Sequence, residues 1–168
     1  MAKFINPDTI APPIGRYTHA VETGPNTRLL HISGQVGIGR DGKIAQGFGA
    51  QCAQIWTNIG AILEAAGMSF TDLIRVTTYL VNSADIPESR AARLAVLGEH
   101  RPASTLLVIS GLATPDYLVE IEAWAAQAVA PTAAAKAVAA RKSAKPAAKG
   151  TSKAQAKTKS KAKSGKRR

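Results

Sequence analysis

The uneven distribution of residue types along the chain is the feature that most constrains its fold. All acidic and aromatic residues, and every Leu and Ile, lie before residue 131 of the 168. Of the 22 Lys and Arg residues, 13 lie after residue 130, which leaves nine against all 11 acidic residues before it. A segment without large apolar side chains cannot bury enough surface to offset the entropy lost on ordering it. We therefore predict one folded domain over residues 1–130 and a disordered, Lys/Ala-rich basic tail over residues 131–168.

The apolar spacing in the first 130 residues alternates between strand and helix patterns. Ile55 and Ile59 lie on a helical stripe that ends before Gly67, a residue suited to the left-handed position after a helix. Asp85 is typical of the cap of a second helix, which Gly98 ends. The predicted strands cover residues 17–22, 28–32, 34–38, 73–81, 106–109 and 118–124, and the predicted helices cover 48–66 and 85–97. This order, β-β-β-α-β-α-β-β, predicts an α+β fold with both helices on one face of a sheet.

Two glutamates on the last predicted strand are candidates for chemistry. Side chains alternate between the faces of a strand, so Glu120, Glu122 and Trp124 share one face. Carboxylates about 7 Å apart on one face suit a two-carboxylate active site. Alternating charge is also common on a solvated or paired strand face, so the pattern alone leaves both interpretations open.

Five short segments carry a family resemblance. They are 15–21 (GRYTHAV), 32–35 (ISGQ), 58–67 (NIGAILEAAG), 101–112 (RPASTLLVISGL) and 119–124 (VEIEAW). Together they resemble the Rid family of reactive-intermediate deaminases (RidA/YjgF-like proteins), formerly labelled endoribonuclease L-PSP. The resemblance runs from about residue 12 to residue 126. It implies the YjgF/chorismate mutase-like fold, assembled as a homotrimer with a small-molecule ligand in each cleft between subunits.

The resemblance also implies roles for particular residues. Glu120 matches the family glutamate that positions or activates the attacking water, and it is the catalytic candidate. Tyr17 matches a wall of the family pocket and Ser33 a polar contact in it. Both also have structural interpretations, as a half-buried strand tyrosine and as a strand-end serine satisfied by the backbone.

Position 104 departs from the family pattern. In members that hydrolyse 2-imino and enamine acids the segment reads Pro-Ala-Arg-Ser, and the arginine clamps the substrate carboxylate, whereas this chain has Ser104 there. A charge-assisted pair contributes about 1.5–3 kcal/mol, so we expect simple 2-imino acids to bind poorly. Arg90, which aligns with a family asparagine at the pocket, is the first candidate to replace the clamp, and Arg93 and Arg101 are weaker ones. Arginines on such a helix most often form a solvated face.

Other patterns narrow the class of protein. Cys52, the single cysteine, lies within the predicted helix, so we expect a buried thiol and no disulfide. His19, His31 and His100 have no metal-ligand spacing, so no metal is predicted. No cofactor is predicted either, because the dinucleotide-like GIGRDG at 37–42 lies in a hairpin with no helix after it. With no leader-like or membrane-spanning apolar run, the chain is predicted to be cytoplasmic.

The basic tail is similar in composition to the Lys-rich tails of linker histones and of some bacterial nucleoid proteins. We expect it to bind DNA or RNA through the phosphate backbone, without base recognition. A solubilising extension is the alternative, and a membrane-surface role lacks an apolar or lipid anchor. The candidate nucleic-acid contacts are Lys142, Lys145, Lys149, Lys153, Lys157, Lys159, Lys161, Lys163, Lys166, Arg167 and Arg168.

Two functions remain open at this point. The first is a Rid-like hydrolase or deaminase of a small imine, enamine or related metabolite, in which Glu120 handles water and Tyr17, Ser33 and Ser104 shape the site. The second is a non-catalytic trimer that holds a small molecule in the same cleft while its tail tethers it to nucleic acid. Ser104 weakens the first hypothesis and leaves the second unaffected.

Overall fold

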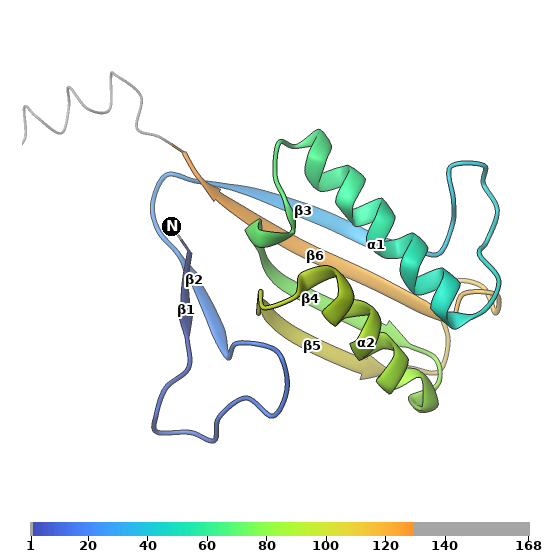
Figure 1. The fold of residues 1–168 in the computed structure, drawn as a ribbon, viewed down its shortest axis with the longest axis horizontal. Helices are drawn as coiled ribbons and strands as arrows, with labels where there is room; N and C mark the ends of the chain where they lie inside the picture. The colour runs from blue at the N-terminus through green and yellow to red at the C-terminus, as the bar shows by residue number, and fades with distance from the viewer. Residues whose placement is uncertain (1, 130–168) are drawn as a thin grey trace, which may run out of the picture. The chain divides into compact units, whose positions relative to one another are not determined.

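A four-stranded mixed sheet with two helices on one face forms the body of the domain (Figure 1). The structure is a computed structural model, and it describes residues 2–129. The elements, in chain order, are β1 (Ala2–Ile5), β2 (Ala20–Thr23), β3 (Thr27–Val36), α1 (Phe48–Ala65), a 3₁₀ turn (Phe70–Asp72), β4 (Leu73–Leu80), a 3₁₀ turn (Ser83–Asp85), α2 (Ile86–Leu97), β5 (Ala103–Val108) and β6 (Val119–Ala128). The predicted α+β class, with both helices on one face of the sheet, is confirmed, whereas β1 was not among the predicted strands.

The order of strands in the sheet is β3-β6-β4-β5. β4 and β5 run parallel, whereas β6 is antiparallel to both of its neighbours, β3 and β4. Parallel neighbours need a crossover connection, and α2 supplies it between β4 and β5. This connection places α2 over the β5 edge of the sheet, while α1 lies across β3 and β6 (Figure 1).

The first three strands are divided differently from the prediction. The predicted strands 28–32 and 34–38 are one strand, β3, whose register shifts between Ile32 and Gln35. Ser33 and Gly34 suggested a strand end, but a β-bulge accommodates extra residues and lets the strand continue. The predicted strand 17–22 begins only at Ala20, and it pairs with β1 in a separate two-stranded ribbon. Tyr17 therefore lies in a loop.

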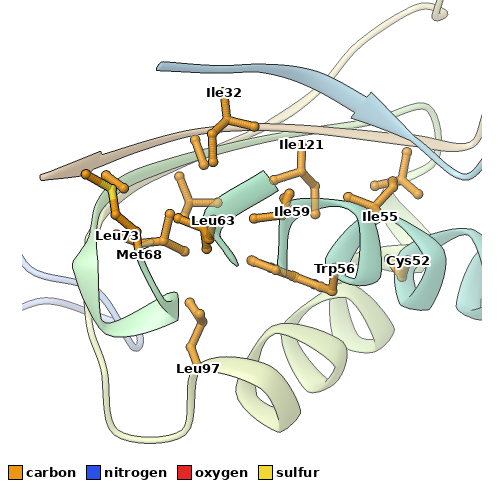
Figure 2. Packing of buried hydrophobic residues seen from close by; sticks show 14 of the residues in the cluster. Ile32, Cys52, Ile55, Trp56, Ile59, Leu63, Met68, Leu73, Leu97 and Ile121 are labelled. Atoms are coloured by element: carbon orange, nitrogen blue, oxygen red, sulfur yellow. The ribbon is translucent and has the colours of Figure 1, made fainter. Parts of the chain in front are cut away.

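The core lies between α1 and the sheet. Ile55, Ile59 and Leu63 from α1 are almost completely buried and point toward Ile32 of β3 and Ile121 of β6 (Figure 2). α1 ends as predicted, because Gly67 adopts a φ of 64° just after it. Full burial of these branched side chains contributes about 1.5–3 kcal/mol each, so this layer fixes the position of α1 on the sheet.

Cys52 lies in the same layer and is fully buried, as expected (Figure 2). Burial, with a further contribution from the carboxylates of Glu88 and Asp85, raises the pKa of the Cys52 thiol to about 12. The thiol is therefore protonated at neutral pH and has no nucleophilic character.

β6 has the predicted alternation of faces. Ile121 and Ala123 are buried beneath the helices, whereas Glu120 and Glu122 are half-buried on the opposite face and Trp124 is 42% exposed there. No helix covers that face within the described residues, and we call it the uncovered face. It includes two further exposed apolar side chains, Leu29 (47%) and Leu107 (41%), which the strand register places on the same side.

In the described part of the chain, no helix is long and apolar enough to span a lipid bilayer. The predicted basic tail, with all of its candidate nucleic-acid contacts, lies outside the described residues.

Candidate ligand-binding site

A cavity of about 560 Å³ opens between α2, β5 and the loop before β2. Three predicted site residues that are far apart in the sequence line this cavity: Tyr17, Arg90 and Ser104. Tyr17 is held there because the next residue, Thr18, is buried and forms a parallel bridge with Ala103 at the start of β5. The loop and the strand thus present Tyr17 and Ser104 to the same space.

Arg93 is the polar side chain that contacts Ser104. Its Nη1 donates a hydrogen bond of 2.6 Å to Ser104 Oγ. Its Nη2 is buried and has no hydrogen-bond partner among residues 2–129. Burial lowers the pKa of Arg93, because desolvation penalises its charged form. A guanidinium remains protonated in proteins, so Arg93 places a cation with one buried, unsatisfied nitrogen beside Ser104.

The position of Arg93 follows from helix geometry. Ser89 and Leu97, four residues before and after it, are the buried residues of α2. Residues four apart lie on the same helix face, so Arg93 belongs to the face that packs against the sheet. Arg90 also lines the cavity but is exposed, and its side chain makes no hydrogen bond to another described residue in this structure. The sequence ranking of Arg90 above Arg93 therefore does not match the contacts at Ser104.

The charge of the cavity lining is one-sided. Arg16, Arg90 and Arg93 line it, and no acidic residue is among the described residues that do. Arg16 is engaged elsewhere, since its Nη2 bonds to the carbonyl of Gly98 at 2.8 Å and to the carboxylate of Glu99. Arg90 and Arg93 form no ion pair within the described chain, so the cavity is electropositive although residues 1–130 have a small excess of acids.

Glu120 and Ser33 lie elsewhere, at the bulge of β3. Glu120 is on the uncovered face, and its carboxylate lies so close to Gly34 that a Cβ at position 34 would overlap Oε1. Ser33 is the exposed neighbour of Gly34 in the same bulge. Tyr79 of β4 lies opposite Glu120 in the sheet. The pKa of the Tyr79 phenol is raised, chiefly by desolvation and to a smaller extent by the negative charges of Glu122 and Glu120. Within one chain, the predicted site residues thus form two groups, and neither Glu120 nor Ser33 lines the cavity that contains Ser104.

Among residues 2–129, no three His, Cys, Asp or Glu side chains come together in a way that could hold a metal ion. The donors that do converge are a guanidinium and a hydroxyl, which suit an anionic organic ligand.

The geometry defines an α+β protein with a cavity beside its second helix, and comparison with known proteins identifies the family. The chain belongs to the endoribonuclease L-PSP family, the family of the Rid proteins, whose sequence model matches residues 9–127. A RutC family protein of Pyrococcus horikoshii is 38% identical over 125 residues, which cover 73% of this chain and 96% of that protein. The 2-iminobutanoate/2-iminopropanoate deaminase of Salmonella typhimurium is 30% identical over 127 residues, with the same coverage.

A solved structure agrees with this assignment. The fold is similar to that of the Rid family protein YyfB of Yersinia pestis, with a TM-score of 0.67 and 33% sequence identity over 75% of this chain and 98% of that one. The family resemblance found in the sequence is therefore confirmed.

Proposed function

We propose that the chain is a Rid-type hydrolase that deaminates a small reactive imine, enamine or related metabolite. The observation that carries this proposal is the convergence of Tyr17, Arg93 and Ser104 on one electropositive cavity, because the family resemblance implies a ligand pocket at the positions of Tyr17 and Ser104. The similarity to a 2-iminobutanoate/2-iminopropanoate deaminase supports the same class of reaction.

The proposed roles follow from the chemistry of imine hydrolysis. Water adds to the C=N carbon to give a carbinolamine, which then expels ammonia and leaves a carbonyl. Glu120 accepts a proton from the attacking water and returns one to the leaving nitrogen, as a general base and then a general acid. Tyr17 forms an apolar wall, and the Arg93–Ser104 pair holds the far end of the ligand.

The separation of Glu120 from the cavity favours assembly of the site from two chains. Glu120 lies on the uncovered face and Ser104 on the helix side of the sheet, so a site that uses both takes each from a different copy. The exposed Leu29, Leu107 and Trp124 give the uncovered face an apolar surface that a second copy can bury. A homotrimer with inter-subunit clefts meets both requirements.

We expect light scattering to give three times the 17.5 kDa chain mass. Trp124→Asp should shift the protein toward monomer, because it places a charge on the uncovered face, which the trimer would bury. Lys43→Asp, on the exposed hairpin before α1, is the matched control and should leave the mass unchanged. A stable monomer of the unaltered chain would contradict both the trimer and the shared site.

Activity is tested with imines released in situ from a panel of amino acids by an amino-acid oxidase, with loss of the imine followed against a chemical trap. We expect faster hydrolysis than the spontaneous rate for part of the panel, with the alanine-derived imine among the slowest because Ser104 cannot clamp its carboxylate. If no member of the panel is hydrolysed although ligands bind, the catalytic proposal fails.

A second candidate is a non-catalytic metabolite-binding trimer tethered to nucleic acid. The observation that favours it is the concentration of 13 basic residues, and no acidic ones, after residue 130. Binding of a ligand without turnover, together with tail-dependent binding of DNA or RNA, would favour this function over the hydrolase.

A further inference from the structure

We propose that Arg93 and Ser104 together form an anion-binding end of the cavity, and that its ligand is an organic carboxylate whose charged group is separated from the reacting carbon by an apolar spacer. The site lies in the same cavity as the proposed function. Only the reacting carbon depends on that function, because without hydrolysis the ligand has none. The binding part stands on the contacts of Arg93 alone.

Two hydrogen-bond donors converge at this end of the cavity. The bond from Arg93 Nη1 to Ser104 Oγ fixes the guanidinium and uses the hydroxyl oxygen as an acceptor. The hydroxyl hydrogen of Ser104 is then available to donate. The Nη2 of Arg93 has no partner among residues 2–129 and almost no accessible surface, so it becomes a second donor once the guanidinium turns toward an anion bound beside Ser104. A partly buried cation with an unsatisfied, desolvated nitrogen is costly, and an anion beside it would offset that cost.

The remaining lining favours an organic acid over an inorganic ion. Arg90 adds positive charge at the rim, and no acidic group opposes it among the described lining residues. Leu94, Leu97 and Leu106 add apolar side chains to the lining, and of these Leu97 is buried. Small-molecule sites combine an apolar lining with a few converging polar groups, and this cavity of about 560 Å³ lies within their usual size range.

The position of the charge determines the shape of the ligand. An arginine at position 104 would carry its own guanidinium from the backbone of β5, with the guanidinium carbon four bonds beyond Cβ. Arg93 instead brings its guanidinium from α2, and Nη1 stops 2.6 Å from the Oγ of Ser104. The positive charge therefore comes from the α2 side of the cavity. The proposal places the reacting carbon away from α2, so several bonds separate that carbon from a carboxylate that reaches Arg93. A 2-imino acid with a short side chain lacks that spacer.

The first measurement is calorimetric titration of the full-length chain with acetate, butyrate and hexanoate, in 150 mM NaCl. We expect affinity to rise with chain length, by up to roughly fourfold for each methylene that becomes fully buried. Hexanamide, the neutral isostere, should bind at least about tenfold more weakly than hexanoate, because it lacks the charge that Arg93 recognises. Inorganic phosphate should also bind more weakly than hexanoate at this site.

The second measurement uses variants. Arg93→Met keeps an unbranched side chain but removes the charge, and it should weaken hexanoate binding by about 10-fold to 100-fold without changing hexanamide binding. Ser104→Ala removes the hydroxyl that positions the guanidinium and should produce a smaller loss of the same kind. Arg40→Met, in the exposed hairpin before α1, is the matched control and should bind hexanoate like the unaltered chain.

Several outcomes would overturn the inference: hexanoate binding unchanged in Arg93→Met, a loss seen only in Arg90→Met, equal affinity for hexanoate and hexanamide, or tighter binding of phosphate than of hexanoate in the unaltered chain. If Arg93→Met does not fold, the comparison of acid with amide in the unaltered chain and in Ser104→Ala decides. The assay needs no turnover, so the two proposals fail separately. If carboxylates bind in an Arg93-dependent way but no imine is hydrolysed, only the hydrolase proposal is contradicted. If imines are hydrolysed and Arg93→Met leaves the rate unchanged, only the inference is contradicted.

Discussion

Raising the salt concentration from 50 to 200 mM is expected to weaken the binding of the full-length chain to a DNA duplex by about 10³-fold to 10⁵-fold. The 13 basic residues after residue 130 have no acidic neighbours in their segment, so each can neutralise a phosphate and release its counterion. Contact with about six to ten phosphates produces an effect of this size. If three tails are joined in a trimer, their raised effective concentration should increase the affinity without any new contact.

Fluorescence anisotropy with two unrelated duplexes and one RNA tests this prediction. All three nucleic acids should bind with similar salt dependence, because phosphate contacts carry no sequence information. The matched control replaces the 11 basic residues from Lys142 to Arg168 by Gln, which keeps the length of the chain and removes most of the charge. Equal binding by a chain that ends at Ala130 would move the nucleic-acid site into the folded domain. Absence of binding by the full-length chain would leave the tail as a solubilising extension.

Local chemistry made much of the fold predictable. The helical stripe of Ile55 and Ile59, with Gly67 after it, indicated α1 and its end, and both are observed. Strand boundaries were less accurate, because pairing between distant segments decides them. β5 begins at Ala103 since Arg75 of β4 pairs with it there, and nothing in the residues near 103 reveals this partner. The bulge in β3 was not predicted either, because small residues such as Ser33 and Gly34 are as typical of a strand end as of a bulge.

The site was predictable only in part. Family motifs pointed to Tyr17 and Ser104, and both residues line one cavity. The same motifs did not reveal that Glu120 lies on the opposite face of the sheet from that cavity. Arg93 was ranked below Arg90 because alignment with the family favoured Arg90. The spacing of Ser89, Arg93 and Leu97 was the available signal, since residues four apart share a helix face. It is weak because two of these three side chains are polar, and a hydrophobic pattern does not include them.

Replacing Glu120 with Gln is expected to lower the rate of imine hydrolysis by about 10²-fold to 10⁴-fold, the usual contribution of a general base. Gln has the same shape as Glu but cannot accept a proton from the attacking water. The measurement is the steady-state rate on the best substrate of the amino-acid oxidase panel, with ligand affinity determined separately. The expected change is in kcat, because the carboxylate of Glu120 acts on water rather than on the ligand's anionic group.

Two companion variants separate this role from a structural one. Glu122→Gln alters the next acidic residue on the same face, whose carboxylate accepts a 3.4 Å hydrogen bond from Tyr79, and it should keep most of the activity. Gly34→Ala leaves the carboxylate of Glu120 intact but places a methyl group where Oε1 lies, so it should reduce kcat by displacing that carboxylate. Equal rates in Glu120→Gln and the unaltered chain would exclude Glu120 as the base. If Glu122→Gln caused the larger loss, the base would be assigned to Glu122, two residues along the same strand face.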